Sequence, residues 1–239
     1  MKHLDFTIDF ETCSMSANAA VMQVAIVPWL RDNDCDPFCS EEGVPCPYVG
    51  YVDLRTCVVD GFDFDPATVK WWSERSYAAK KAVTADLPKP VSDVLITTLD
   101  YIRDIKKRHD VDSMCLWCQG PDVDIAILRN LCRKYDVNLE DIIPHTCFRD
   151  CRTVILEAAY KLACQQRLDA IATAETLLQD GTPVPSPAVS PQEVLAGSRK
   201  AYDLFPPLPS RYDGCLHDAN YDALRSTWYT WQALRVLRN

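Results

Sequence analysis

The chain has 239 residues, a hydrophobic content of 48% and a formal net charge of −9 at pH 7. This apolar content suffices for a folded core and excludes a disordered protein, and the negative charge argues against a nucleic-acid binder held mainly by a basic surface. It leaves open an enzyme that meets phosphates through metal ions, because acidic ligands then supply the cation site.

Twelve cysteines would suggest disulfides in a small secreted protein. However, no export signal opens the sequence and no apolar run reaches membrane-spanning length, so we expect a cytoplasmic protein with reduced thiols. A polar, cysteine-rich loop over residues 31–47 carries Cys35, Cys39 and Cys46, and Cys57 follows it. These four thiols could hold zinc, but they lack the paired C-x2-C spacing of common sites, so we favour free cysteines.

The first predicted strand runs from Leu4 to Thr12, and its alternating apolar residues indicate burial. Asp9 and Glu11 lie two residues apart on it, so both carboxylates point to the same face. Two such acids repel each other near a core unless a cation lies between them. The pair therefore predicts half of a divalent-metal site, the alternative being a solvent-facing pair at the strand end.

Two further strands and two helices follow. An apolar, β-branched strand is expected over 19–29, ended by Pro28, and a third strand over 48–56, which together with the first form an antiparallel meander. Asp65 and a following proline open a helix that carries Trp71 and Trp72. Adjacent tryptophans are most often core residues, and stacking of one of them on a base is the alternative. Helical periodicity predicts another helix over 91–109.

A short apolar run over 113–118 predicts a buried strand, broken by Gln119-Gly120-Pro121. The next helix is expected to continue to Tyr135, with Asp122 as its cap and Asp124 in its first turns. This places an acid at the carboxyl edge of the sheet, where open α/β folds have their sites.

The last strand is expected over 145–148, followed by a helical stretch from Asp150. The proline-rich segment 182–191 is expected to join two peripheral helices. A final helix ends near Leu237, with His217 in the loop before it and Asp222 in its first turns. Both side chains can face a site at the helix N-terminus, although each alone is as readily a cap or a surface residue.

Three motifs in this order carry a family resemblance: Asp9-x-Glu11, Gly120-x3-Asp124 and His217-x-Ala219-x2-Asp222. Together with the segments FTIDFETCSMSANAAVMQVAIV, ATVKWWSERS, FRDCRTVILEA and HDANYDA, they resemble the blocks of DnaQ-like DEDDh exonucleases. Within that group the chain is most similar to the phage exonuclease A family and to RNase AS-type exoribonucleases. Residues 31–47 and 163–212 match least.

The middle motif departs from the family pattern. Gln119 and Val123 stand where relatives often have Asn and Phe, and Asp122 competes with Asp124 for the role of the motif's acid. The distance from Gly120 favours Asp124.

The resemblance implies an α/β, RNase H-like fold: a mixed five-stranded sheet flanked by helices. We expect one domain over 1–239, with the cysteine-rich loop at 31–47 and a helical, proline-bearing insertion at about 163–212. The order of strands and helices expected from composition agrees with that fold.

The resemblance also implies hydrolysis of single-stranded nucleic acid from a 3′ end to nucleoside monophosphates, with two Mg²⁺ or Mn²⁺ ions. The implied metal ligands are Asp9, Glu11, Asp124 and Asp222, with His217 as general base. Implied substrate contacts are Thr12, Cys13 and Ser14, with Trp71 and Arg152 as further candidates. Arg149 and Arg152, on either side of Asp150, would orient phosphate or brace the acids. DNA is preferred over RNA as substrate, no membrane partner is expected, and a homodimer is left open.

Two other classes fit less well. A haloacid-dehalogenase-type phosphatase would need a second Asp where Glu11 stands. A catalytically silent nucleic-acid-binding or partner-binding module of this fold would lack one or more of the five site residues, all of which are present.

Overall fold

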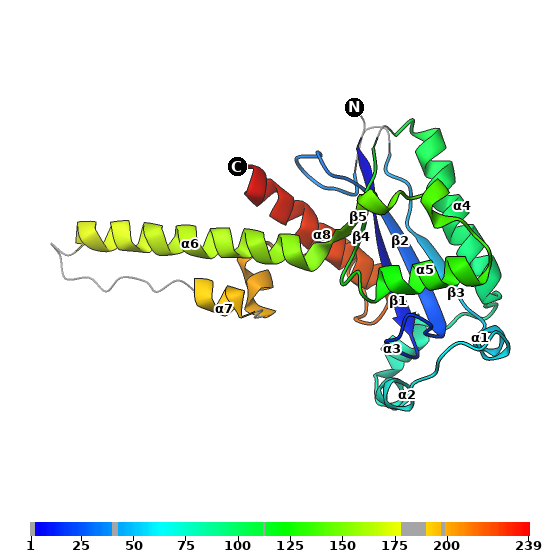
Figure 1. Ribbon diagram of the computed structural model, residues 1–239. Helices are drawn as coiled ribbons and strands as arrows, with labels where there is room; N and C mark the ends of the chain where they lie inside the picture. The colour runs from blue at the N-terminus through cyan, green and yellow to red at the C-terminus, as the bar shows by residue number, and fades with distance from the viewer. Residues whose placement is uncertain (1–2, 40–42, 112, 178–189, 197–198) are drawn as a thin grey trace. The chain divides into compact units, whose positions relative to one another are not determined.

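The computed structural model describes residues 3–39, 43–111, 113–177, 190–196 and 199–239 (Figure 1). Its contacts divide the chain into two compact units, Met1–Asp150 with Ser210–Thr227, and Cys151–Pro209 with Trp228–Asn239. The single exonuclease domain expected over the whole chain stays a prediction.

The first unit is built on a mixed five-stranded sheet in the order β3-β2-β1-β4-β5. β1 pairs antiparallel with β2, and β2 pairs antiparallel with β3, which confirms the predicted meander. β4 runs parallel to β1, and β5 runs parallel to β4. The strands are β1 (Leu4–Thr12), β2 (Val21–Leu30), β3 (Tyr48–Tyr51), β4 (Leu116–Cys118) and β5 (Phe148–Asp150).

Pro28 does not end the second strand as expected, because β2 continues to Leu30. Pro28 lies opposite Phe6 of β1, whose backbone N–H donates to Cys115 of the β4 segment at 2.9 Å. The backbone nitrogen of Pro28 therefore faces the β3 side, where pairing has already stopped at Ile26. A missing donor costs nothing at a position that has no partner strand.

The helices of the first unit are α1 (Leu54–Val59), α2 (Pro66–Ser73), α3 (Tyr77–Ala82), α4 (Val91–Arg108) and α5 (Asp124–Lys134). α2 begins as predicted, with Asp65 accepting hydrogen bonds from the backbone of Ala67 and Thr68. α4 buries the apolar positions that its periodicity marked, namely Val94, Leu95, Thr98, Leu99, Ile102 and Ile105. α8 (Ala219–Arg238) begins in this unit and ends in the second.

Several boundaries differ from the predictions. The third strand ends at Tyr51, and Thr56 lies in α1, because Asp53 caps that helix by accepting from the backbone N–H of Arg55. Residues 145–147 form a short 3-10 helix, so β5 begins only at Phe148. β2 begins at Val21 and β4 at Leu116, each later than expected.

Asp5 anchors the start of β1 in the core. Its carboxylate, 1% exposed, accepts hydrogen bonds from the Arg31 guanidinium, from the backbone N–H of Cys115 and from Trp117 Nε1. A buried carboxylate with this many donors ties three segments together.

The cysteines are free thiols. Cys57 is buried, while Cys35, Cys39 and Cys46 are exposed. Among the described residues these thiols form no group that could hold a metal ion.

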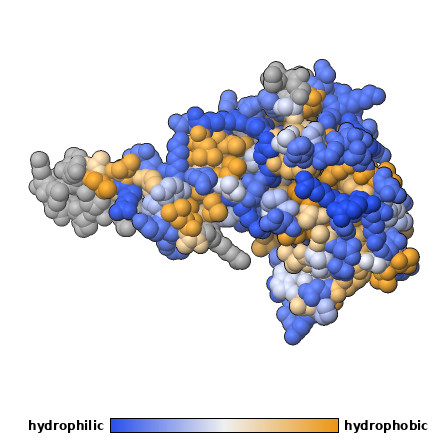
Figure 2. Space-filling view, viewed as in Figure 1, coloured by the Kyte–Doolittle hydropathy of each residue, from blue (hydrophilic) through white to orange (hydrophobic). Residues whose placement is uncertain are grey.

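The second unit contains α6 (Cys151–Leu177), α7 (Pro191–Leu195) and the end of α8. Helix formation from Asp150 onward is confirmed by α6. Of the predicted linker 182–191, residues 182–189 lie outside the described residues, while Ser190 caps α7 in a reciprocal pair with Glu193. Apolar patches are visible on this unit (Figure 2), where Leu168, Ile171 and Leu195 are exposed. Within the described ranges, none of the helices combines the length and apolarity that crossing a bilayer requires.

Candidate active site

The carboxyl-terminal half of β1 carries the first two acids of the site. Asp9 and Glu11 are half-buried and separated by one residue of an unbroken strand, so they share a face, as predicted. Glu11 lies opposite Gln23 of β2 in the strand register.

Asp124 reaches the site from the turn between β4 and α5. Gly120 adopts φ 125°, a conformation that L side chains rarely adopt, and its carbonyl accepts from the backbone N–H of Asp124 at 3.2 Å. Asp124 is 6% exposed in the first turn of α5. The expected cap role of Asp122 is wrong: Val123 occupies the cap position without a side-chain bond, because the Gly120 turn starts the helix. Asp122 points to solvent.

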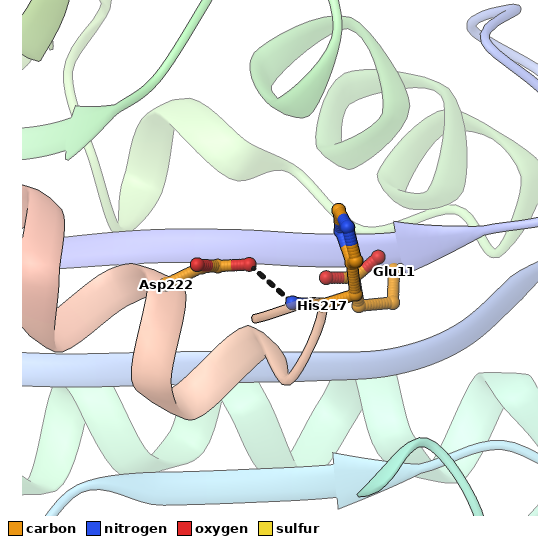
Figure 3. Close-up of side chains that lie close together, drawn as sticks. All are labelled: Glu11, His217 and Asp222. Carbon is orange, nitrogen blue, oxygen red and sulfur yellow. Dashed lines mark hydrogen bonds between the residues drawn. The ribbon is translucent and has the colours of Figure 1, made fainter. Parts of the chain in front are cut away.

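The loop before α8 and the first turn of that helix supply the other two groups. The backbone N–H of His217 donates to Asp222 Oδ2 at 2.9 Å (Figure 3). The nearest ligand atoms of Glu11, His217 and Asp222 lie within 4.8 Å of one another. Residues more than two hundred positions apart in the sequence thus meet at the end of β1.

The acids perturb one another electrostatically. Burial raises the pKa of Glu11 to about 8, and the neighbouring charges of Asp222, Asp124 and Asp218 add to this effect. The pKa of Asp9 is raised well above its usual range. Burial is the largest cause, followed by the negative charges of the neighbouring acids, namely Asp124, Glu11, Asp222 and Asp218. Burial likewise raises the pKa of Asp222, opposed by the hydrogen bond from His217. The neighbouring charges that raise the pKa values of Asp9 and Glu11 are all carboxylates, so a cation would relieve the repulsion.

The donor set fits a hard divalent cation. Carboxylate oxygens are the ligands that Mg²⁺ and Mn²⁺ prefer, and a half-buried acid cluster with raised pKa values is the environment that such an ion stabilises. Asp9, Glu11, Asp124 and Asp222 could supply these oxygens, while the imidazole of His217 stands beside them.

Two residues with a part in this site were missed. Gln23 is fully buried: its Oε1 accepts from the backbone N–H of Ala219 at 2.9 Å, and its Nε2 donates to Asp218 Oδ1 at 3.0 Å. Gln23 thereby fixes the beginning of α8 to the strand beside Glu11. Asp218 adds negative charge to the cluster. The sequence did indicate that Gln23 is unusual, because it is a lone polar residue in an otherwise apolar strand.

The implied substrate contacts at the end of β1 and directly after it are buried in this structure. Thr12 Oγ1 donates to the carbonyl of Ser14 at 2.6 Å, and Ser14 and Cys13 are each 5% exposed. Burial raises the pKa of the Cys13 thiol to about 11, which keeps it neutral. Ser14 Oγ accepts from the backbone N–H of Ser16 at 3.1 Å, so Thr12 and Ser14 stabilise the local turn, while Cys13 packs in the hydrophobic core.

The two tryptophans of α2 differ in environment. Trp72 is buried and donates from Nε1 to the Thr12 carbonyl at 2.9 Å, which makes it a core residue as expected. Trp71 is 38% exposed and lies against the imidazole of His217, with ring centroids 4.7 Å apart.

The two arginines beside Asp150 are exposed. Arg149 donates to the carbonyls of Thr146 and Phe148, which ties its side chain to the neighbouring backbone. Arg152 lies in the first turn of α6, in the second unit, whereas the acids and His217 all belong to the first unit.

Comparison with known proteins gives a family and several similar chains. A family model described as the 3′-5′ exoribonuclease Rv2179c-like domain matches residues 4–180. An exodeoxyribonuclease of Enterobacteria phage T4 is 28% identical over 137 residues, which cover 54% of this chain and 56% of that protein. The chain thus spans little more than half the length of this curated relative.

Two solved structures resemble the chain more distantly. The nuclease domain of 3′hExo, a DEDDh family member bound to rAMP, is 11% identical with a TM-score of 0.49, over 99% of this chain and 92% of that one. Zinc-bound Escherichia coli ExoI in complex with single-stranded DNA is 14% identical with a TM-score of 0.44, over 100% of this chain and 41% of that one.

The family match covers well over half of the sequence and includes the Asp9, Glu11 and Asp124 motifs. It confirms the resemblance that the motifs carried, and the observed mixed sheet confirms the implied fold. The chain therefore belongs to the family of Rv2179c-like 3′-5′ exoribonuclease domains.

Proposed function

We propose that this protein is a metal-dependent 3′-to-5′ exonuclease that releases nucleoside monophosphates from single-stranded nucleic acid, with DNA as the preferred substrate. The observation that carries the proposal is the meeting of Asp9, Glu11, Asp124, His217 and Asp222 at the end of β1, in a chain of this family.

The cofactors of the proposal are two Mg²⁺ or Mn²⁺ ions. Asp9, Glu11 and Asp222 would hold one, and Asp9 and Asp124 would hold the other. When bound, the ions would neutralise charge on the scissile phosphate and make a water molecule more acidic.

His217 is the proposed general base. Imidazole can accept a proton near neutral pH, and the Asp222 carboxylate, which accepts from the backbone of His217, keeps the His217 loop beside the acids. The water oxygen attacks the terminal phosphorus as His217 takes its proton, and the bond to the 3′ oxygen breaks. The shortened strand keeps that oxygen, which takes up a proton from solvent water and becomes the new 3′-hydroxyl, and the monophosphate leaves.

Both DNA and RNA have support as the substrate. The phage T4 relative is named an exodeoxyribonuclease, which favours DNA. The description of the family names an exoribonuclease, which favours RNA as the second candidate. Selection between them would depend on contacts to the 2′-hydroxyl. Residues 12–14 remain the proposed substrate contacts, and the proposed location is the cytoplasm.

The test is digestion of matched, 5′-labelled single strands of DNA and RNA with Mg²⁺, Mn²⁺ or EDTA, with identification of the products. The expected result is stepwise shortening from the 3′ end that requires a divalent ion. Asp9→Ala should abolish shortening while the protein remains folded, and Asp124→Ala should behave similarly. Asp122→Ala, which removes an exposed acid two residues from Asp124, is the matched control and should digest normally.

A strand that is shifted in a gel but never shortened would indicate a binding module instead. Digestion by Asp9→Ala at the wild-type rate would show that the site is wrongly assigned.

A further inference from the structure

The backbone of His217 is held in an unusual conformation. Its φ of 67° lies in the left-handed region, which non-glycine residues adopt only when their surroundings impose it. The surroundings are the hydrogen bond from the His217 N–H to Asp222 and the two bonds of Gln23, which donates to Asp218 and accepts from the backbone N–H of Ala219. These bonds act on the loop and leave the orientation of the imidazole ring to other contacts.

Those contacts come from α2. The Trp71 ring meets the His217 ring edge-on, with centroids 4.7 Å apart and planes at 83°. Trp72 is farther away, at 6.1 Å. An edge-to-face pair restricts ring rotation because the favourable electrostatic geometry is narrow.

Trp71 is itself held in place. The Arg75 guanidinium lies 4.2 Å from the centre of its ring, and Arg75 Nε donates to the Trp71 carbonyl at 3.2 Å. The helix that carries it is bonded to the chain directly after Glu11: Trp72 Nε1 donates to the Thr12 carbonyl, and the Asp65 N–H donates to the Cys13 carbonyl, each at 2.9 Å. These hydrogen bonds therefore fix the position of Trp71 relative to the strand that carries the acids.

We propose that Trp71 is a positioning residue that orients the His217 imidazole for proton abstraction, rather than a platform on which a substrate base stacks. Its effect on turnover rests on the proposed nuclease function, whereas its effect on the ring orientation does not. Trp71 thus connects Glu11 and His217, which come from opposite ends of the sequence, through α2.

The kinetic test compares Trp71→Leu, which removes the ring, with Trp71→Phe, which keeps one. Tyr77→Leu is the control because Tyr77 is an aromatic residue of the next helix, 78% exposed, with no ring contact among the described residues. The expected result for Trp71→Leu is a kcat lower by about three- to tenfold with an almost unchanged KM, the factor that one aromatic pair is typically worth. Trp71→Phe should recover most of this loss, and Tyr77→Leu should match wild type.

A double-mutant cycle distinguishes a residue that positions His217 from one on which a substrate base stacks. In the His217→Ala background, Trp71→Leu should cause no further loss of kcat, because its effect passes through the missing ring. A stacking platform would instead raise KM, and by the same factor in both backgrounds. That outcome would overturn the proposal.

A spectroscopic measurement tests the orientation of the His217 ring without depending on nuclease activity. The chain has only four histidines, so ¹³C-histidine labelling gives few imidazole signals, and His217→Ala identifies the one of interest. Trp71→Leu should move the His217 signals and give them the relaxation of a freely rotating ring, and Trp71→Phe should do so less. Unchanged His217 signals would overturn the proposal even if digestion slowed. Absence of digestion by the wild type would count against the nuclease function alone.

Discussion

Removing one acid of the cluster should make the metal-free protein more stable at neutral pH. Glu11→Gln keeps the shape of the side chain and deletes a charge that three neighbouring carboxylates oppose. The folded protein holds the Glu11 proton up to about pH 8, whereas an unfolded chain releases it near pH 4.5. Between these values the folded state binds more protons, so the free energy of unfolding falls as pH rises.

The size of the loss in unfolding free energy follows from the rise in the pKa of Glu11. One pKa unit corresponds to about 1.4 kcal/mol, so a carboxyl displaced this far costs the folded protein roughly 3–5 kcal/mol once it is ionised. The raised pKa of Asp9 acts in the same direction. Wild type should therefore lose a few kcal/mol between pH 5 and pH 8, and Glu11→Gln distinctly less.

Urea unfolding in EDTA, followed by tryptophan fluorescence across this pH range, measures the difference. Glu74→Gln replaces an exposed glutamate and should follow the wild-type curve. Addition of Mn²⁺ at pH 8 should stabilise wild type more than Glu11→Gln. If the wild-type and Glu11→Gln curves run parallel in EDTA, the electrostatic account of the site is refuted.

Three other substitutions test separate parts of the structure. His217→Ala should slow turnover by about 10²- to 10⁴-fold, as expected for loss of a general base, while Mn²⁺ binding measured by calorimetry stays near wild type; lost binding would make His217 a ligand instead. Gln23→Leu should lower Mn²⁺ affinity or activity by about tenfold or more through the start of α8, and an unchanged affinity and rate would contradict its positioning role. Asp5→Ala should cost roughly 3–5 kcal/mol in urea unfolding because it leaves the donors of the partly exposed Arg31 and the buried Trp117 without their carboxylate, and a cost near zero would speak against that network.

Sequence predicted the long, strongly periodic elements well. The strand over 4–12 was predicted to the residue, and α2 and α4 began where their capping signals and periodicity indicated. The candidate acids of the site could be named because each lies in a motif with fixed spacing. Their proximity could be inferred only through the family, since no local pattern relates Glu11 to Asp222.

The predictions were wrong or incomplete where only a few residues determine the local structure. β5 has three residues, too few for a period of two to stand out, and its predicted position was three residues early. Asp53 began a helix where alternation favoured a strand, because a capping bond outweighs a weak pattern. The role of Gln23 depends on a helix almost two hundred residues away, which a local pattern does not contain.

Pro28 has a consequence for the length of the second strand. Beyond Ile26, the outer edge of β2 is not paired with β3, although Val27, Pro28 and Trp29 are buried. A backbone N–H in such a position would lie in the interior without a strand to accept its hydrogen bond, which costs free energy. Pro28 has no N–H to offer there, and the N–H of Leu30 is bonded to the Pro37 carbonyl at 2.8 Å. The proline thus lets β2 extend past its neighbour without an unsatisfied donor, and its replacement by valine would introduce one.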